Sequence, residues 1–334
     1  MTEIQKDRFA PAPKDNVSSE KIAKPQLSFT KDAWLRIRKN KGALVSIVVL
    51  ALIVLMAIIG PHLSPYDGYA QDVTKANLPP KVSGLEWLGF DGTQEIGGVK
   101  TDVYEQQNVE ENYWFGTDSL GRDLFTRTWL GTRVSLYIAL LAALIDMAIG
   151  VVYGLVSGFK GGRVDNVMQR ILEVLSGIPN LIVVILMLLI LKPGILSITI
   201  AMVITGWIGM ARVVRGQVLK LKDQEYILAS RTLGAKNNRL LGKHLLPNLS
   251  GVIIINTMFT IPSAIFFEAF LSFIGIGLQP PRASLGTLIE DGYETFQFLP
   301  HLMIIPCIVI CIILITCNLI GDGLRDAFDP KMRD

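Results

Sequence analysis

Residues 43–60 read ALVSIVVLALIVLMAIIG, eighteen positions without a charged side chain. At a rise of about 1.5 Å per residue, a helix of this length nearly crosses the roughly 30 Å hydrocarbon core of a bilayer. The whole chain of 334 residues is 50% hydrophobic and 18% charged, whereas about a quarter of the residues of a soluble protein carry a charge. The sequence therefore excludes a purely soluble enzyme and predicts an integral membrane protein.

Five more apolar segments follow this one. They are about twice as long as a membrane-spanning β-strand and are apolar throughout rather than in alternation, so helices are favoured over a barrel. We therefore predict an all-α integral membrane protein with six transmembrane helices. After the first helix, over 43–60, the predicted spans cover 134–158, 171–191, 194–211, 249–272 and 299–321.

The distribution of basic residues predicts the orientation, because lysine and arginine accumulate on the cytoplasmic side of a membrane. If the N-terminus lies inside, the inner segments carry 24 of the 32 basic residues. We therefore expect both termini in the cytoplasm, with residues 1–42 as a tail and an interfacial helix and residues 322–334 as a second tail. Residues 61–131 then form a long extracytoplasmic loop, which is either a docking surface for another protein or a solvated insertion.

The chain lacks the short motifs that mark common catalytic sites, namely GxxxxGK, HExxH, GxSxG and CxxC. We therefore expect no catalytic residue, no metal site and no cofactor in this chain. Transport is favoured over catalysis, either as an ion-coupled carrier, a channel, or the membrane half of a pump driven by a separate ATPase. Asp146 and Glu268 are the candidate residues for ion coupling, because an ionised carboxylate within a bilayer costs at least about 2.5 kcal/mol.

Gly150, Gly154 and Gly158 are spaced by four and therefore share one face of the second predicted span. Such a face lets another helix backbone approach closely. The partner is either another helix of this chain, which we favour, or a second subunit.

The basic segment 212–248 is longer than two adjacent spans require. Its core, DQEYILASRTLGAKNNRLLGKHLLPN over 223–248, predicts a helix, a stop at Gly234 and a second short helix. A DNA-binding helix-turn-helix also contains a central glycine, but both ends of this segment lie close to the bilayer, and we expect no nucleic acid. A short amphipathic helix set into a groove of a partner protein is the favoured interpretation.

Ala229-Ser230, Gly234, His244 and Leu246-Pro247 resemble the EAA loop of ABC importer permeases, the element that sits in a cleft of the ATPase subunit. The sequence departs from the general form at Leu228, where a glutamate is usual, and at His244, where isoleucine is commoner. The resemblance implies a role in ATPase coupling for Glu225, Ala229, Ser230, Gly234, Ala235, His244, Leu246 and Pro247.

Two further segments are similar to signatures of the C-type permease of dipeptide and oligopeptide ABC importers. They are GTDSLGRD at 116–123 and EAFLSFIGIGLQPP at 268–281. We expect Asp118, Arg122 and Asp123 to form a salt-bridged turn that organises the start of the second span. The residues that match family motifs are Gly116, Thr117, Asp118, Gly121, Arg122, Asp123, Asp165, Arg170, Glu268, Gln279, Pro280 and Pro281.

The resemblance implies a type I ABC importer permease fold, with a permease core at 132–321 and a coupling loop at 212–248. It also implies a subunit of an ATP-driven peptide importer in a prokaryotic cell membrane, forming half of the translocation path by alternating access. The implied partners are a homologous second permease, two ABC ATPases that bind ATP and Mg²⁺, an extracytoplasmic peptide-binding protein and the peptide itself. The acidic stretch 84–112 favours oligopeptides. The alternative hypothesis is an ion-coupled secondary transporter that uses Asp146 and Glu268.

Overall fold

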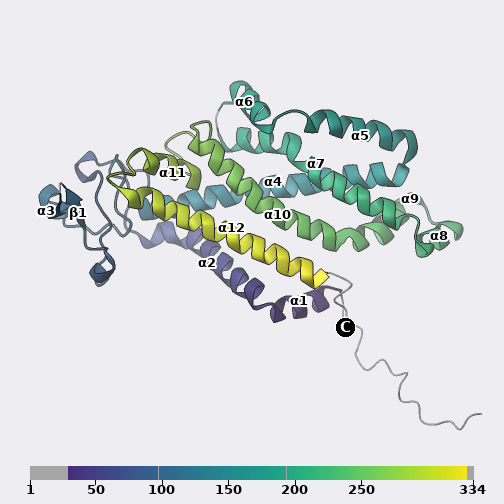
Figure 1. Cartoon of the computed structure of the whole chain (residues 1–334), viewed down its shortest axis with the longest axis horizontal. Coiled ribbons are helices and arrows are strands. Elements are labelled where there is room, and N and C mark those ends of the chain that lie inside the picture. Colours follow the sequence, from purple (N-terminus) through teal and green to yellow (C-terminus); the bar gives the residue numbers. More distant parts are fainter. Residues whose placement is uncertain (1–28, 97, 193, 329–334) are drawn as a thin grey trace, which may run out of the picture.

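The computed structural model describes residues 29–96, 98–192 and 194–328. Long helices run side by side along the molecule, with a small hairpin and α3 at one end and α8 and α9 at the other (Figure 1). Five of the described helical stretches are long and apolar enough to cross a membrane, which confirms an all-helical membrane fold. They are α2 (Lys41–Leu63), α4 (Leu124–Lys160), α7 (Ile195–Leu221), the stretch Asn237–Phe273 that contains α10 (Leu246–Phe273), and α12 (Pro300–Phe328).

The span predicted over 171–191 is not one continuous helix. Helix α5 (Gly162–Ser176) ends within the first half of this range. Helix α6 (Asn180–Ile190) follows it, and the two helix axes are bent by 79°. Pro179 explains the break, because its ring removes a backbone donor and cannot continue a helix begun upstream. The bent pair forms either a sixth, broken span or a re-entrant segment.

Several helices are longer than the apolar segments from which they are predicted. Helix α4 begins at Leu124 rather than at 134, because the carboxylate of Asp123 caps it by accepting from Thr126 N at 3.0 Å and from Thr126 Oγ1 at 2.6 Å. Helix α7 likewise continues to Leu221, and α12 continues into the segment predicted as a tail. The predicted loop 212–248 is therefore largely helical.

Helix α1 (Phe29–Lys39) occupies the place of the predicted interfacial helix. Its buried Ala33 and Ile37 pack with Ala43 of α2 and Ala327 of α12. It is thus held against the bundle as well as being amphipathic. Residues 1–28, the first part of the segment 1–42 predicted as a tail and an interfacial helix, lie outside the described residues, as do residues 329–334.

The three spaced glycines of α4 pack against α7. A Cβ atom at Gly154 would lie 2.6 Å from the backbone oxygen of Ala211, and one at Gly158 would lie 2.9 Å from Val218 Cβ. A Cβ atom at Gly150 would lie 2.6 Å from Met210 Cβ. Intrachain packing, the interpretation favoured from the sequence, is confirmed.

The segment between α2 and α4 is folded rather than irregular. It contains a small core of Leu78, Val103, Tyr104, Val109 and Tyr113. Tyr104 also donates a hydrogen bond from its hydroxyl to Pro79 O at 2.8 Å. Its elements are the 3-10 turns η3 (Val73–Lys75) and η4 (Glu86–Leu88), the antiparallel strands β1 (Thr93–Ile96) and β2 (Val99–Asp102), and α3 (Val103–Gln107).

Candidate functional site

The predicted helix, stop and second helix lie at the end of the molecule where α7 leaves the bundle (Figure 1). Helix α8 (Glu225–Thr232) is followed by Gly234, whose φ of +83° is one that side-chain-bearing residues rarely adopt. The helix end is closed by Leu233 N donating to Ala229 O and Ala235 N donating to Ser230 O, both at 3.1 Å. A short helix α9 (Asn237–Arg239) and a π-helical turn η5 (Leu240–Leu245) then lead into α10.

Helix α8 is fastened to two spanning helices through its single fully buried residue, Ile227. Ile227 belongs to a buried cluster that also contains Met210, Val214, Val218, Leu240, Leu245, Leu249 and Ile253, from α7, η5 and α10. Tyr226 and Asn248 add a polar link, since Asn248 Nδ2 donates to Tyr226 Oη at 3.3 Å and to His244 O at 2.7 Å. The buried cluster and the polar link thus connect α8 with η5 and with the adjoining parts of α7 and α10.

The opposite side of α8 and its flanks carry exposed apolar residues. Leu233 is 88% exposed, and Tyr226, Leu228 and Leu246 are also exposed. Of the residues predicted to couple to an ATPase, Glu225, Ala229, Gly234, Leu246 and Pro247 are exposed, whereas Ser230, Ala235 and His244 are half-buried. The structure brings them together around α8 and the start of α10. Tyr226 and Asn248, which connect these parts, were not among the sequence-predicted site residues.

The motif 116–123 forms a charged turn at the other end of α4. Asp118 Oδ2 lies 2.7 Å from Arg122 Nε and 3.3 Å from Arg127 Nε. Both arginines also approach Asp291 Oδ2 of α11 (Leu285–Glu294), at 3.7 and 3.5 Å. We call Asp118, Arg122, Arg127 and Asp291 the outer ion network. Burial raises the pKa of the Asp291 carboxyl, although the two arginines oppose that shift.

The remaining residues of this motif build the turn itself. Gly121 has a φ of +73°, and a Cβ there would collide with the backbone oxygen of Asp72. Gly116 has a φ of +81°, and a Cβ there would likewise collide with the backbone oxygen of Leu78. Thr117 Oγ1 donates to Lys75 O at 2.5 Å and accepts from Leu78 N at 2.9 Å. The motif therefore clamps the folded outer segment onto the start of α4.

Glu268 is fully buried and accepts hydrogen bonds from Ser135 Oγ at 2.7 Å and Ser272 Oγ at 2.9 Å. Ser135 Oγ also accepts from Leu285 N at 3.2 Å. Glu268 thus joins α10, α4 and the start of α11. The other residues of its motif, Gln279, Pro280 and Pro281, lie exposed in the connection from α10 to α11.

Asp165 and Arg170 of α5 have different surroundings. Asp165 forms two 2.6 Å contacts with the guanidinium of Arg215 on α7 and accepts from Ser157 Oγ of α4 at 2.5 Å. It therefore ties three helices together. Arg170 pairs with Glu173 at 2.6 Å, and their side chains are 81% and 56% exposed.

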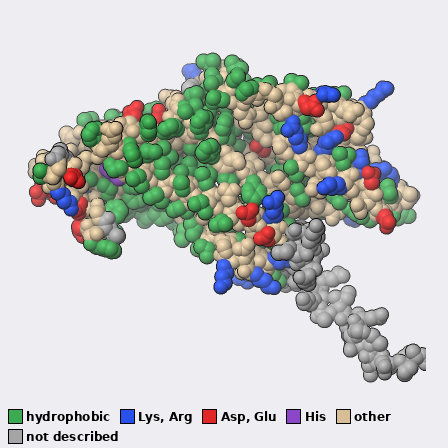
Figure 2. All heavy atoms as spheres, viewed as in Figure 1, with side chains coloured by type: hydrophobic (Ala, Val, Ile, Leu, Met, Phe, Trp, Pro, Cys, Tyr) green, Lys and Arg blue, Asp and Glu red, His purple; other side chains and the backbone are tan. Residues whose placement is uncertain are grey.

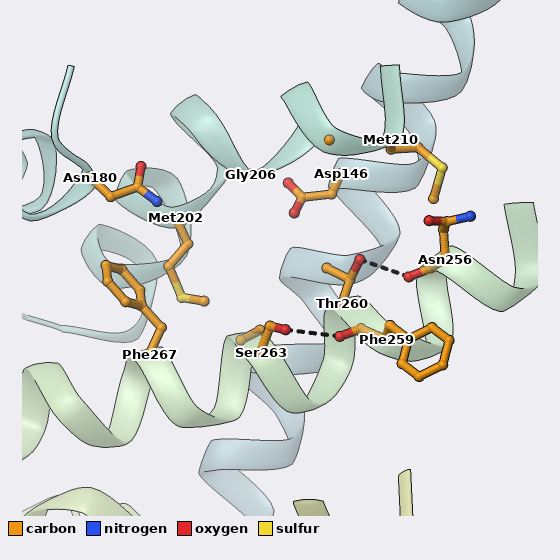
Figure 3. A pocket seen from close by; sticks show the side chains of 12 residues that line it. Asp146, Asn180, Met202, Gly206, Met210, Asn256, Phe259, Thr260, Ser263 and Phe267 are labelled. Carbon is orange, nitrogen blue, oxygen red and sulfur yellow. Dashed lines mark hydrogen bonds between the residues drawn. The ribbon is translucent and has the colours of Figure 1, made fainter. Parts of the chain in front are cut away.

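A cavity of about 340 Å³ lies between α4, α6, α7 and α10, where Asp146, Asn180 and Asn256 provide polar groups (Figure 3). Glu268 is not among its lining residues. Glu268 contacts α4 at Ser135, and Asp146 lies eleven residues further along that helix, or roughly 16 Å. The two acids of the ion-coupled alternative therefore occupy separate sites. Within the described ranges, no group of three or more His, Cys, Asp and Glu residues is placed to hold a metal ion.

Comparison with known proteins gives full-length relatives. The chain is 46% identical over 333 residues to the oligopeptide transport system permease protein OppC of Bacillus subtilis, with 100% of both chains covered. It is 48% identical over 339 residues to the dipeptide transport system permease protein DppC of Lactococcus lactis subsp. cremoris, with 99% of both covered.

The fold also has a solved counterpart. The inward-facing MetNI methionine ABC transporter matches 60% of this chain and 97% of its own with a TM-score of 0.50. At 19% identity this likeness shows the fold alone. Residues 28–80 match the N-terminal TM domain of oligopeptide transport permease C, and residues 150–334 match the binding-protein-dependent transport system inner membrane component. The chain therefore belongs to the family of binding-protein-dependent transport system inner membrane components, the multi-span permease subunits of ABC importers.

Proposed function

We propose that this chain is the permease subunit of an ATP-driven peptide importer and that its cargo is oligopeptides. The observation that carries the proposal is the end-to-end identity with both an oligopeptide and a dipeptide permease. The match of residues 28–80 to the N-terminal domain of oligopeptide transport permease C favours the longer cargo.

In this proposal separate ATPase subunits bind and hydrolyse ATP, because the sequence of this chain has no phosphate-binding loop for ATP. Two ABC ATPases sit at the α8 end, a homologous second permease completes the path, and a peptide-binding protein docks at the end that carries β1, β2 and α3. Figure 2 shows Lys and Arg side chains gathered at the end that carries α1, α5 and α8, beside a broad hydrophobic surface. This distribution supports a cytoplasmic position for α8.

The packing of α8 explains how closure of the ATPases reaches the translocation path. Ile227 transmits a push on α8 to α7 and α10, because it is buried among their side chains. The same two helices line the cavity of Figure 3 through Met202 and Met210 on one side and Asn256 and Phe267 on the other. ATP binding thus biases a two-state rocking of these helices rather than driving chemistry in this chain.

Replacing Gly234 with Leu is expected to uncouple ATP hydrolysis from peptide uptake. The left-handed backbone at Gly234 disfavours any side chain by roughly 1–2 kcal/mol, so the turn that fixes α8 against the ATPase changes shape. The purified complex should still hydrolyse ATP, while uptake of a labelled oligopeptide into proteoliposomes falls at least about tenfold.

The control is Gly242→Leu, in the same segment. Gly242 has no positive φ, and nothing lies within 4 Å of a Cβ built there, as is also true of Gly234. This variant should transport at nearly the wild-type rate. Normal uptake by the Gly234→Leu complex would refute the coupling role of α8, and a wild-type complex that imports no peptide would refute the proposed function.

A further inference from the structure

The cavity between α7 and α10 contains one acidic side chain that the assignment of the family does not explain. Asp146 of α4 is only 6% exposed, and its Oδ1 atom is buried without a hydrogen-bond partner among the described residues. The backbone of α7 closes one side of the carboxylate, since a Cβ atom at Gly206 would collide with it. In Figure 3 the carboxylate points into the space between α7 and α10.

An unpaired buried carboxylate is costly, and the cost is greatest at membrane depth. No residue that lines the cavity carries a positive charge. The cavity lining therefore offers no counter-ion to an ionised Asp146, and a molecule that enters the cavity can supply one.

The polar groups of α10 define the chemistry of that molecule. Asn256 Nδ2 donates to Val252 O at 2.8 Å, Thr260 Oγ1 donates to Asn256 O at 3.0 Å, and Ser263 Oγ donates to Phe259 O at 3.0 Å. One N–H of Asn256 and both hydroxyl protons are used within the helix, so the amide oxygen of Asn256 and the lone pairs of both hydroxyls remain as acceptors. Together with Asp146 they form a wall of acceptors that suits a positively charged hydrogen-bond donor.

The other side of the cavity suits a peptide better than a metal ion. The side-chain oxygen of Asn180 accepts from the Thr205 hydroxyl, which leaves the amide nitrogen of Asn180 to donate to a peptide carbonyl. Met202, Met210, Phe259 and Phe267 add an adaptable apolar surface for varied side chains. Calcium and magnesium need six or more oxygen ligands and commonly several carboxylates, whereas this cavity supplies one carboxylate.

We propose that this cavity binds an ammonium group of the transported peptide, with Asp146 as its counter-ion and Asn256, Thr260 and Ser263 as further acceptors. The inference rests on the proposed function, because it assigns a step in the passage of that cargo. Two sources supply the ammonium group, the peptide N-terminus and a lysine side chain. When the N-terminus is the source, the site binds a group that every unmodified peptide carries, whatever the sequence of the peptide.

The test measures protection of a cysteine in the cavity wall. Gly209→Cys, at a lining position where nothing lies within 4 Å of an added Cβ, is introduced into a chain whose Cys307, Cys311 and Cys317 are replaced by Ala, and the complex of permeases and ATPases is labelled with a neutral thiol reagent. Ala-Ala-Phe with a free N-terminus should protect this cysteine at a concentration roughly tenfold or more below that needed for its N-acetyl form. Asp146→Asn should remove the difference, whereas Asp322→Asn, at the far end of α12, should leave it unchanged. An N-acetylated peptide that contains lysine identifies which ammonium group the site accepts.

Equal protection by the free and acetylated peptides would overturn the proposal, as would an unchanged preference in the Asp146→Asn complex. A preference that disappears when divalent cations are chelated would assign the site to a metal ion instead. If Asp146→Asn does not assemble, Asn256→Leu removes an acceptor without touching the charge and should weaken the preference at least about threefold. Import of Ala-Ala-Phe by the wild-type complex with its binding protein is measured in parallel, so that equal protection with intact import refutes the ammonium site alone.

Discussion

Replacing Asp118 with Ala is expected to destabilise the permease by about 3–5 kcal/mol, the usual cost of breaking a buried ion pair. The side chains of Arg122 and Arg127 are only 6% and 3% exposed, and Asp118 is their nearest carboxylate. The variant leaves both arginines to share Asp291, which is half-exposed and lies 3.5 Å or more away. Asp118 Oδ1 also accepts from Leu120 N and Arg122 N at 3.0 Å, so the turn before α4 loses these two side-chain bonds as well. A lower midpoint of thermal unfolding of the purified complex measures the effect.

The control for this variant is Glu173→Ala. Its ion pair with Arg170 has a similar N–O distance of 2.6 Å, but both side chains are largely exposed. Exposed pairs contribute about 0–1 kcal/mol, so the midpoint should hardly move. Replacing Asp118 and Arg122 together should cost less than replacing Asp118 alone, because one of the stranded charges is removed as well. Equal small shifts for Asp118→Ala and Glu173→Ala would contradict a supporting role for the outer ion network.

The apolar spans were predictable from the sequence because the length of an uncharged segment is a local property. The ends of the helices were not, since they depend on capping and on contacts in water. Asp123 caps α4, which begins ten residues before the predicted span, and the polar end of α7 continues as helix. The break at Pro179 was not predicted, because the spans were assigned from hydropathy and apolar residues lie on either side of Pro179.

The candidate sites were also predictable only where the signal in the sequence is local. The helix and stop around Gly234 were predictable because a glycine after a helical pattern is a local signal. Arg127 and Asp291 were not, since their contact joins α4 to α11 and nothing in their spacing indicates it. Asp146 was predicted to be important from the cost of a charge in a bilayer, but its neighbours Asn180 and Asn256 come from two other helices. The packing of α4 against α7 and α10, and of α6 against α7, brings these residues to a common cavity.

The close packing of α4 against α7 leads to the prediction that Gly154→Leu prevents assembly of a functional permease. A Cβ atom at Gly154 would lie 2.6 Å from Ala211 O and 2.8 Å from Val214 Cβ, so the helices must separate. Separation costs at least about 3 kcal/mol, the upper part of the range for overpacked cores. It also loosens the α7 residues that hold Ile227, and both the yield of monodisperse complex and peptide uptake should fall. The matched control is Gly216→Leu on α7, where nothing lies within 4 Å of the added Cβ. Equal yields and uptake for the two variants would mean that this packing does not constrain the movement of α7.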